Sequence, residues 1–171
     1  MQKKLNWISQ IKFLCFDVDG TLYRDVPEIW NAIQPKIYDR IIKQKHWDES
    51  RTASEFRRAY ENLGSSTKVL ESFGIDGQEF FTEAFEKFDF SKYVQKDKNL
   101  LRLINELKKQ YQVGVLSNGN SAAVKKKLEA IGLSSKIFRP FLTTYEFGAL
   151  KPDPAPFLKV IEDADVSPEE S

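Results

Sequence analysis

The chain has 171 residues and is 41% hydrophobic, so it can bury a core without disulfides or a structural metal. Its 26 Lys and Arg residues almost balance its 25 Asp and Glu residues, and a net charge of +1 gives no general attraction to nucleic acid or to an anionic membrane. One Cys and one His exclude a disulfide framework and a Cys/His zinc site. Without an apolar run of roughly 20 residues or a recognisable secretory signal, we expect a cytoplasmic protein.

Short apolar segments alternate with amphipathic helices in the first and last parts of the chain. Strands are predicted at 11–16, 112–116 and 139–144. Helices are predicted at 98–110, with Asp97 as the N-cap, and at 121–131, closed by Gly132. Strands that alternate with helices indicate βαβ units, so the fold class expected is α/β with a parallel sheet.

The segment between the first strand and the next βα unit contains no convincing strand. Helices are predicted there at 27–45, 49–63, 66–73 and 77–88, and Pro35 is expected to kink or divide the first of them. A connection of this length is better explained by an inserted domain than by a loop. The predicted organisation is therefore a core at 1–24, a helical cap at 25–94, and the rest of the core at 95–171.

Six phenylalanines gather in one part of the predicted cap. Those near its end follow helical spacing, which favours a role in the cap's own core. A contact with a base or sugar is the alternative. The residues are Phe73, Phe80, Phe81, Phe85, Phe88 and Phe90.

The strongest chemical signal is the run Asp17-Val18-Asp19-Gly20, directly after the first predicted strand. In open α/β sheets, ligands bind beyond the carboxyl ends of the strands. Two carboxylates separated by one residue can act on one substrate there, and Gly20 permits a sharp turn that brings backbone N–H groups near a phosphate. A simple Asp-Gly turn with a solvated Asp19 is the alternative for this motif taken alone.

Two further motifs occur where a phosphate site needs them. Ser117-Asn118-Gly119 ends the second strand, and a hydroxyl with backbone amides at a strand-to-helix junction suits a phosphate oxygen. Lys151 lies between Gly148 and Pro154 in a segment whose prolines restrict the backbone around one ammonium group. Each motif alone is weak, because Ser-Asn-Gly and Lys-Pro also occur in ordinary turns.

Together the three motifs resemble the haloacid dehalogenase (HAD) superfamily, in its order, from about residue 11 to residue 164. The resemblance implies a doubly wound, Rossmann-like core with an α-helical cap inserted after the first motif. It also implies that Asp17 is the nucleophile and Asp19 the general acid/base, with Ser117, Asn118 and Lys151 as the phosphate-binding residues. Mg²⁺ would be held by Asp17 and by the backbone carbonyl of Asp19.

The physical chemistry agrees with these roles. A carboxylate that attacks a phosphate meets like-charge repulsion, roughly 4 kcal/mol for two unit charges 4 Å apart at an effective dielectric of 20. Lys151 and Mg²⁺ would offset this repulsion. Asp19 could protonate the leaving oxygen and then deprotonate the attacking water. We therefore expect a Mg²⁺-dependent phosphomonoester hydrolase that acts through an aspartyl-phosphate.

The motifs leave several alternatives open. A sugar-phosphate mutase would use the same intermediate, whereas dehalogenases and P-type pumps of the superfamily lack the second aspartate. Cys15 is not expected to be a nucleophile, because the six residues after it contain no Arg, which a cysteine phosphatase loop needs. As part of a predicted buried strand, it is expected to pack in the core. The lysines of 125–127 are expected to form a solvated helix face.

The superfamily's fourth motif, a strand leading to an acidic pair, is not found after the predicted helix 155–164. A shortened copy of a longer protein is the favoured explanation, and a degraded, non-catalytic binding module is the alternative.

The run from Tyr60 to Thr67 resembles the pyrimidine 5′-nucleotidase branch, which suggests a nucleoside 5′-monophosphate. The expected partner is a small phosphate ester, not nucleic acid or a membrane.

Overall fold

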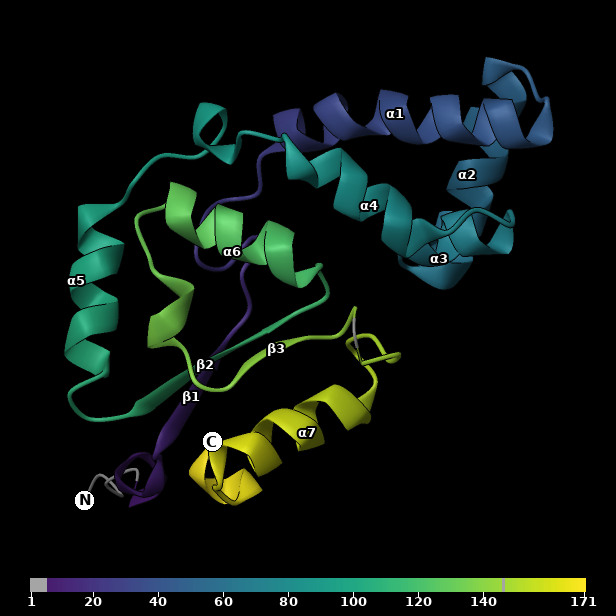
Figure 1. Ribbon diagram of the computed structural model, residues 1–171. Helices are drawn as coiled ribbons and strands as arrows, with labels where there is room; N and C mark the ends of the chain where they lie inside the picture. Colours follow the sequence, from purple (N-terminus) through teal and green to yellow (C-terminus); the bar gives the residue numbers. More distant parts are fainter. Residues whose placement is uncertain (1–5, 146) are drawn as a thin grey trace, which may run out of the picture. The chain divides into compact units, whose positions relative to one another are not determined.

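A computed structural model describes residues 6–145 and 147–171, which form two compact units. Unit 1 comprises Met1–Asp25 and Phe90–Ser171, and unit 2 comprises Val26–Asp89. In Figure 1, unit 1 contains all the labelled strands, and unit 2 contains α1 to α4.

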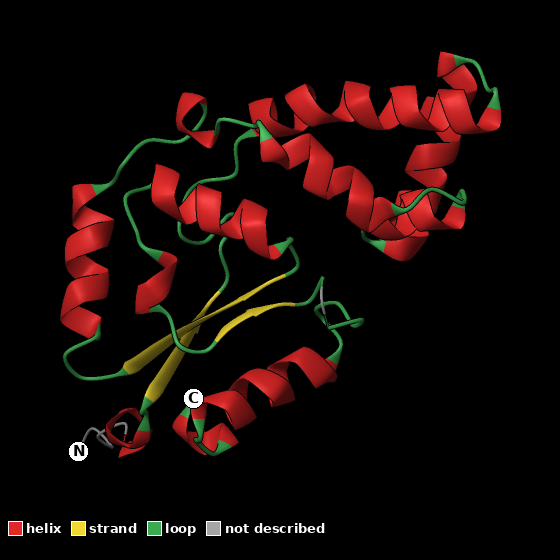
Figure 2. Cartoon of the chain, in the orientation of Figure 1, coloured by secondary structure: helices red, strands yellow, loops and turns green. Residues whose placement is uncertain are grey.

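Unit 1 is built on a parallel sheet whose strand order is β1-β2-β3 (Figure 2). The strands are β1 (Phe13–Phe16), β2 (Gln112–Ser117) and β3 (Phe141–Thr143). Val115 of the central strand pairs with Phe16 on one side and Phe141 on the other. The predicted parallel sheet is confirmed, and its topology brings the carboxyl ends of all three strands to one edge.

Helices cover both faces of this sheet, with α6 on one side and α7 on the other (Figure 1). The helices of unit 1 are α5 (Lys98–Leu107), α6 (Ser121–Ala130) and α7 (Pro154–Ala164). Short 3₁₀ helices add η1 (Asn6–Gln10), η2 (Phe90–Lys92), η3 (Ser135–Ile137) and η4 (Pro168–Glu170). The doubly wound α/β core expected from the sequence is therefore confirmed.

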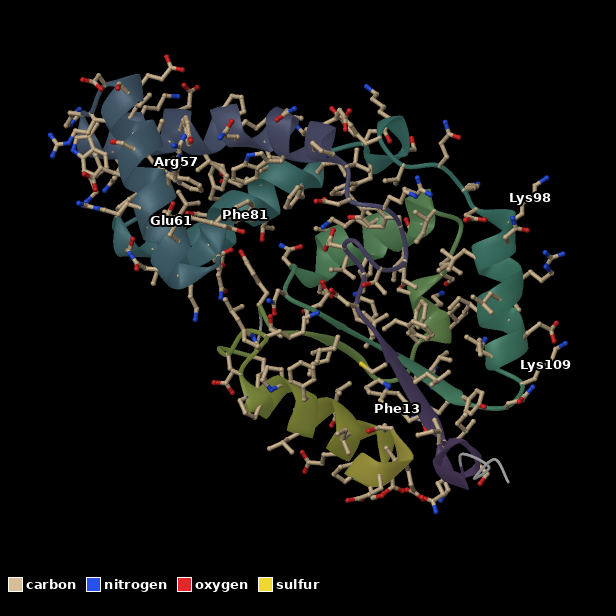
Figure 3. All side chains as sticks on the ribbon, turned by 180° about the vertical axis from the view of Figure 1, so that it is seen from behind. Phe13, Arg57, Glu61, Phe81, Lys98 and Lys109 are labelled. Carbon is tan, nitrogen blue, oxygen red and sulfur yellow. The ribbon has the colours of Figure 1, made fainter. Side chains whose placement is uncertain are left out.

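The face of the sheet under α7 packs around Phe13, which is fully buried with Leu116 and Val160 (Figure 3). Gly114 makes this packing possible, because a Cβ at that position would lie 2.6 Å from the Phe13 ring. The aromatic ring thus lies directly against the backbone of the neighbouring strand.

Asp97 caps α5 as predicted: its side chain accepts hydrogen bonds from the backbone N–H groups of Asn99 and Leu100, at 2.8 and 3.1 Å. Ile104 is the fully buried side chain of this helix. Lys98 and Lys109, near the two ends of the helix, point away from it (Figure 3). One face of α5 therefore packs inward and the other is charged.

Unit 2 consists of α1 (Pro27–Lys45), α2 (Glu49–Leu63), α3 (Ser66–Ser72) and α4 (Gly77–Glu86). The four helices lie where the sequence predicts them. The expected division of α1 at Pro35 is wrong, since one helix runs from Pro27 to Lys45, and the alternative of a kink at Pro35 stays a prediction. Pro35 removes one backbone N–H donor, but Ile33, Ile37 and Ile41 form a buried stripe along the helix, and that packing holds it together.

The core of unit 2 is aromatic and aliphatic. Phe80 and Phe81 are buried in it, and Phe73, Phe85 and Phe88 pack against it. Phe90 differs from the other five, because it begins η2 in unit 1 and packs beneath α6. The residues that follow Asp89 thus belong to unit 1, whereas the sequence-based boundary lies at residue 94.

Within the part of the chain that the structure describes, none of the helices is both long and apolar enough to cross a membrane.

Candidate active site

Asp17 follows β1 at the carboxyl edge of the sheet, and its side chain is 43% exposed. The Lys151 ammonium lies 2.7 Å from Asp17 Oδ1, which also accepts a hydrogen bond of 2.8 Å from the Val18 backbone N–H. Asp17 Oδ2 has no hydrogen-bond partner among the described residues. One oxygen of this carboxylate is therefore fixed, and the other is available to a ligand.

Lys151 is held from both of its ends. Its side chain is only 18% exposed, and its ammonium donates to the backbone carbonyl of Leu116 at 2.9 Å as well as contacting Asp17. Its backbone N–H donates to Asn118 Oδ1 at 2.9 Å, and its carbonyl accepts from Asn118 Nδ2 at 3.2 Å. The lysine of the third motif is thus fastened to the end of β2.

Asn118 uses its side chain for this fastening. Besides the two bonds to Lys151, Asn118 Oδ1 accepts a hydrogen bond of 2.9 Å from the Thr144 hydroxyl. These contacts join the segments after β2 and β3. Direct binding of phosphate by Asn118 stays a prediction, and the contacts present in the structure give it a role in positioning Lys151.

Ser117, the last residue of β2, is 1% exposed and its Oγ accepts a hydrogen bond of 3.1 Å from the Gly119 backbone N–H. Next to it, Asn120 caps α6 by accepting a 2.8 Å bond from the Ala123 backbone N–H. The turn is tight, because a Cβ on Gly119 would lie 2.9 Å from a methyl group of Val124. Ser117 therefore lies at the strand-to-helix junction, but it makes no described contact with Asp17 or Asp19.

Asp19 has a lysine partner of its own. The ammonium of Lys127 lies 2.7 Å from Asp19 Oδ1, although the two residues are 108 positions apart. The Tyr23 hydroxyl donates to the same oxygen. The loop closes tightly, since Gly20 has φ of +73° and the backbone N–H of Leu22 donates to the Val18 carbonyl at 3.0 Å.

Tyr23 stays protonated as this donor. The pKa of its phenol is raised above the usual range, first because the ring is buried and then because the charge of Asp19, with those of Asp25 and Asp17, opposes a second anion.

The expectation that 125–127 forms a solvated face is wrong at Lys127. This side chain is 11% exposed, and its ammonium also lies 5.6 Å from the centre of the buried Phe90 ring. The helix period could have revealed it, because position 127 falls beside Val124 and Leu128 on the buried face of α6. The prediction treats the three consecutive lysines as one exposed group and does not consider the helical position of each.

Cys15 is exposed, not packed as expected, because β1 lies at the edge of the described sheet and has only β2 beside it. The pKa of its thiol is nevertheless raised to about 11, chiefly by desolvation from the protein atoms around the sulfur; Lys151 lowers it less, and Asp17 raises it further. The thiol is thus protonated at neutral pH and is no rival nucleophile.

The donor set at Asp17 fits a magnesium ion in a limited way. Mg²⁺ is commonly bound by one or two carboxylates together with water and substrate phosphates, and Asp17 Oδ2 is a carboxylate oxygen with no described partner. The Asp19 side chain is a poorer ligand, because an ammonium occupies its Oδ1. Within residues 6–145 and 147–171 no three acidic, His or Cys side chains gather as a metal cluster.

Comparison with known proteins gives related structures. A 2-haloacid dehalogenase from Pseudomonas syringae pv. Tomato DC3000 is 27% identical, with a TM-score of 0.54 over 91% of this chain and 74% of that one. HAD-hydrolase YfnB from Bacillus subtilis, bound to magnesium, is 20% identical, with a TM-score of 0.51 over 94% and 76%. A HAD family enzyme from Bacteroides thetaiotaomicron, in complex with magnesium and inorganic phosphate, is 22% identical, with a TM-score of 0.52 over 94% and 82%.

No curated protein matches the chain. The family profile described as "Hydrolase: haloacid dehalogenase-like hydrolase" matches residues 11–171, which include all three motifs and the lysine on α6. The chain belongs to the haloacid dehalogenase-like hydrolase family.

Proposed function

We propose that this protein is a Mg²⁺-dependent phosphomonoester hydrolase that forms an aspartyl-phosphate on Asp17. The observation that carries the proposal is the asymmetric Asp17 carboxylate. Lys151 holds its Oδ1 at 2.7 Å, and its Oδ2 is left without a partner among the described residues. A carboxylate fixed in this way is oriented for attack, and the neighbouring ammonium offsets the repulsion between two anions.

The reaction has two displacements at phosphorus. In the first, an Asp17 oxygen forms a bond to phosphorus while the bond to the ester oxygen breaks, and Asp19 gives that leaving oxygen a proton. In the second, a water molecule attacks phosphorus and gives its proton to Asp19, and the bond to Asp17 breaks. The products are an alcohol and inorganic phosphate, and both carboxyl groups return to their starting states.

Asp17 and the backbone carbonyl of Asp19 would hold the Mg²⁺, which when bound adds positive charge beside the phosphoryl oxygens. Support for magnesium comes from the two magnesium-bound neighbours and from the Asp17 oxygen that has no partner among the described residues.

Dehalogenation is the rival reaction, because a neighbour at 27% identity is a 2-haloacid dehalogenase. A dehalogenase has no leaving alkoxide to protonate and therefore no use for an acid at position 19. The chain has an aspartate there, with a lysine and a tyrosine directed at it. These contacts favour an ester substrate.

For the substrate, we propose a small soluble phosphate ester, with nucleoside 5′-monophosphates as the leading class. This rests on the resemblance of the run from Tyr60 to Thr67 to the pyrimidine 5′-nucleotidase branch. A sugar-phosphate mutase is the alternative, since it would return the phosphoryl group to a sugar.

The test is a substrate panel with the full chain, with and without Mg²⁺. We expect phosphate release from p-nitrophenyl phosphate that stops on addition of EDTA, and faster release from nucleoside monophosphates than from glycerol phosphate. Asp19→Asn should release phosphate from a nucleoside monophosphate about 10² to 10⁴ more slowly than the wild type, the usual value of general acid–base catalysis. Chloride release from 2-chloropropionate without phosphatase activity would replace the proposal with dehalogenation, and an isomerised hexose phosphate would replace it with a mutase.

A further inference from the structure

Lys127 is a buried lysine that the two displacement steps do not account for. It lies on the inner face of α6 with Ala123, Val124 and Leu128, and its side chain is 11% exposed. Burying an ammonium is costly unless a charge and hydrogen bonds compensate for it. The compensation here is Asp19 Oδ1 at 2.7 Å, with the Phe90 ring centre 5.6 Å from the ammonium.

The contacts on Asp19 are unevenly divided between its two oxygens. Oδ1 takes both the Lys127 ammonium and the Tyr23 hydroxyl. Oδ2 has no partner in the described part of the chain, and the side chain is 45% exposed. One oxygen therefore contacts two donors, and the other has no described partner.

We propose that Lys127 and Tyr23 are positioning residues that clamp Asp19 by Oδ1, so that Oδ2 carries the catalytic proton. The inference rests on the function proposed above. Lys127 and Tyr23 then join the residues on which catalysis depends, and the acid/base role belongs to Asp19 Oδ2.

A fixed carboxyl group matters because proton transfer needs the donor and acceptor atoms within about 2.6 to 3.2 Å. In the first step the Oδ2–H bond breaks and the proton passes to the ester oxygen as the P–O bond breaks. In the second step Oδ2 accepts the proton of the attacking water. A carboxyl group free to rotate about its side-chain torsions would spend much of its time in other orientations, which lowers the rate of both transfers.

Replacing Lys127 and replacing Lys151 are expected to change kcat and KM differently, because the two lysines contact different carboxylates. Lys151 lies on the nucleophile and is expected to contact the phosphoryl group. Lys127 contacts Asp19, so its loss should lower kcat and leave KM almost unchanged. Lys125 is a matched control, because it is an exposed lysine of the same helix. Its ammonium lies 5.7 Å from the centre of the Phe141 ring and makes no described contact with Asp19.

The first experiment compares Lys127→Met, Lys127→Arg, Tyr23→Phe and Lys125→Met in single-turnover reactions of the full chain. Alcohol release from an alkyl phosphate should slow by about 10² in Lys127→Met, because alkoxide must be protonated as it leaves. Release of nitrophenol from p-nitrophenyl phosphate should change far less, since nitrophenoxide leaves as an anion. Lys127→Arg should recover part of the loss and Lys125→Met should match the wild type. Equal slowing with both substrates would overturn the proposal.

A double-mutant cycle then asks whether Lys127 acts only through Asp19. If it does, adding Lys127→Met to Asp19→Asn should change kcat by less than about twofold, because the group it positions is already disabled. A further loss as large as that in the wild-type background would show an independent role and contradict the clamp.

Crystal structures of the wild type and of Lys127→Met give a test that needs no turnover. The clamp predicts one Asp19 rotamer in the wild type, with Oδ1 toward position 127, and a displaced or multiple rotamer in the variant. An unchanged Asp19 rotamer in the variant would reject the clamp even if the phosphatase activity is confirmed. A wild-type protein that releases no phosphate would reject the proposed function, while the crystal structures would still decide whether Lys127 orients Asp19.

Discussion

Unit 2 and unit 1 use their charged residues differently. Among the described residues of unit 2, Arg58 pairs with Glu55 on the same helix, and the core is mainly aliphatic and aromatic. In unit 1 two lysines that are 18% and 11% exposed reach carboxylates far away in the sequence, each at 2.7 Å. Local interactions thus build unit 2, whereas the topology of the sheet builds the site in unit 1.

Asp17→Asn should cause the largest loss of activity, because it removes the proposed nucleophile. It should leave the helices intact, because Asp17 is not part of one. The amide is nearly isosteric and keeps an oxygen for Lys151 but cannot act as an anionic nucleophile. We expect hydrolysis of p-nitrophenyl phosphate to fall to the background rate, with the far-ultraviolet circular dichroism unchanged. Turnover close to that of the wild type would place the covalent step elsewhere.

Phe56→Ala should instead lower stability, because it removes a buried side chain from the core of unit 2. Phe56 is 4% exposed and contacts the rings of Trp30, Tyr38 and Tyr60, with centroids 5.6 to 6.1 Å away. Removing a buried Phe typically costs about 3 to 5 kcal/mol. The free energy of unfolding, measured with urea, should fall by that amount.

Tyr60→Ala is the matched control for Phe56→Ala, since Tyr60 is 44% exposed on the same helix. It should cost about 1 kcal/mol or less. Equal losses for the two variants would mean that the aromatic cluster does not form the core of unit 2.

Asn118→Ala should affect activity less than Asp17→Asn does, and stability less than Phe56→Ala does. It leaves the Lys151 backbone N–H and the Thr144 hydroxyl without their partner. We expect a loss of about 1 kcal/mol in unfolding free energy and a lower kcat from a less firmly held Lys151. If Asn118 instead binds the phosphate directly, KM should rise while the unfolding free energy stays constant.

The smallest expected effect concerns the Cys15 thiol, whose alkylation rate should depend on pH. Its thiol has a pKa raised from 9.0 to about 11, so iodoacetamide should react slowly at pH 8 and faster as the pH approaches 11. Because the folded state holds this proton more tightly than the unfolded state, stability should fall as the pH rises from 9.0 through about 11. Rapid alkylation at neutral pH would show a thiolate and contradict the shift.

The sequence predicts most of the fold because its signals are local. In the structure, the helices α2, α3 and α4 begin at capping residues, Asp48, Ser65 and Asp76, whose side chains accept backbone hydrogen bonds. The parallel sheet follows from three short apolar runs. The continuity of α1 through Pro35 could not be predicted, because packing of the isoleucine stripe outweighs a lost hydrogen bond.

In the site, the motifs identify Asp17 and Lys151 because both occupy recognisable sequence patterns, and the structure places them in contact. Lys127 lies outside any motif, and its partner Asp19 is 108 positions away, so its role depends on how α6 packs. Asn118 and Cys15 show the same limit, because neither hydrogen bonds between loops nor exposure at a sheet edge can be predicted from neighbouring residues.

Chemical trapping of the intermediate tests the central claim most directly. The full chain is mixed with a phosphomonoester and Mg²⁺, quenched in acid and treated with borohydride, which reduces an aspartyl-phosphate to homoserine. Peptide mass mapping should find homoserine at position 17 in the wild type and none in Asp17→Asn. Continued phosphate release with aspartate unmodified at position 17 in every quenched sample would contradict covalent catalysis by this residue.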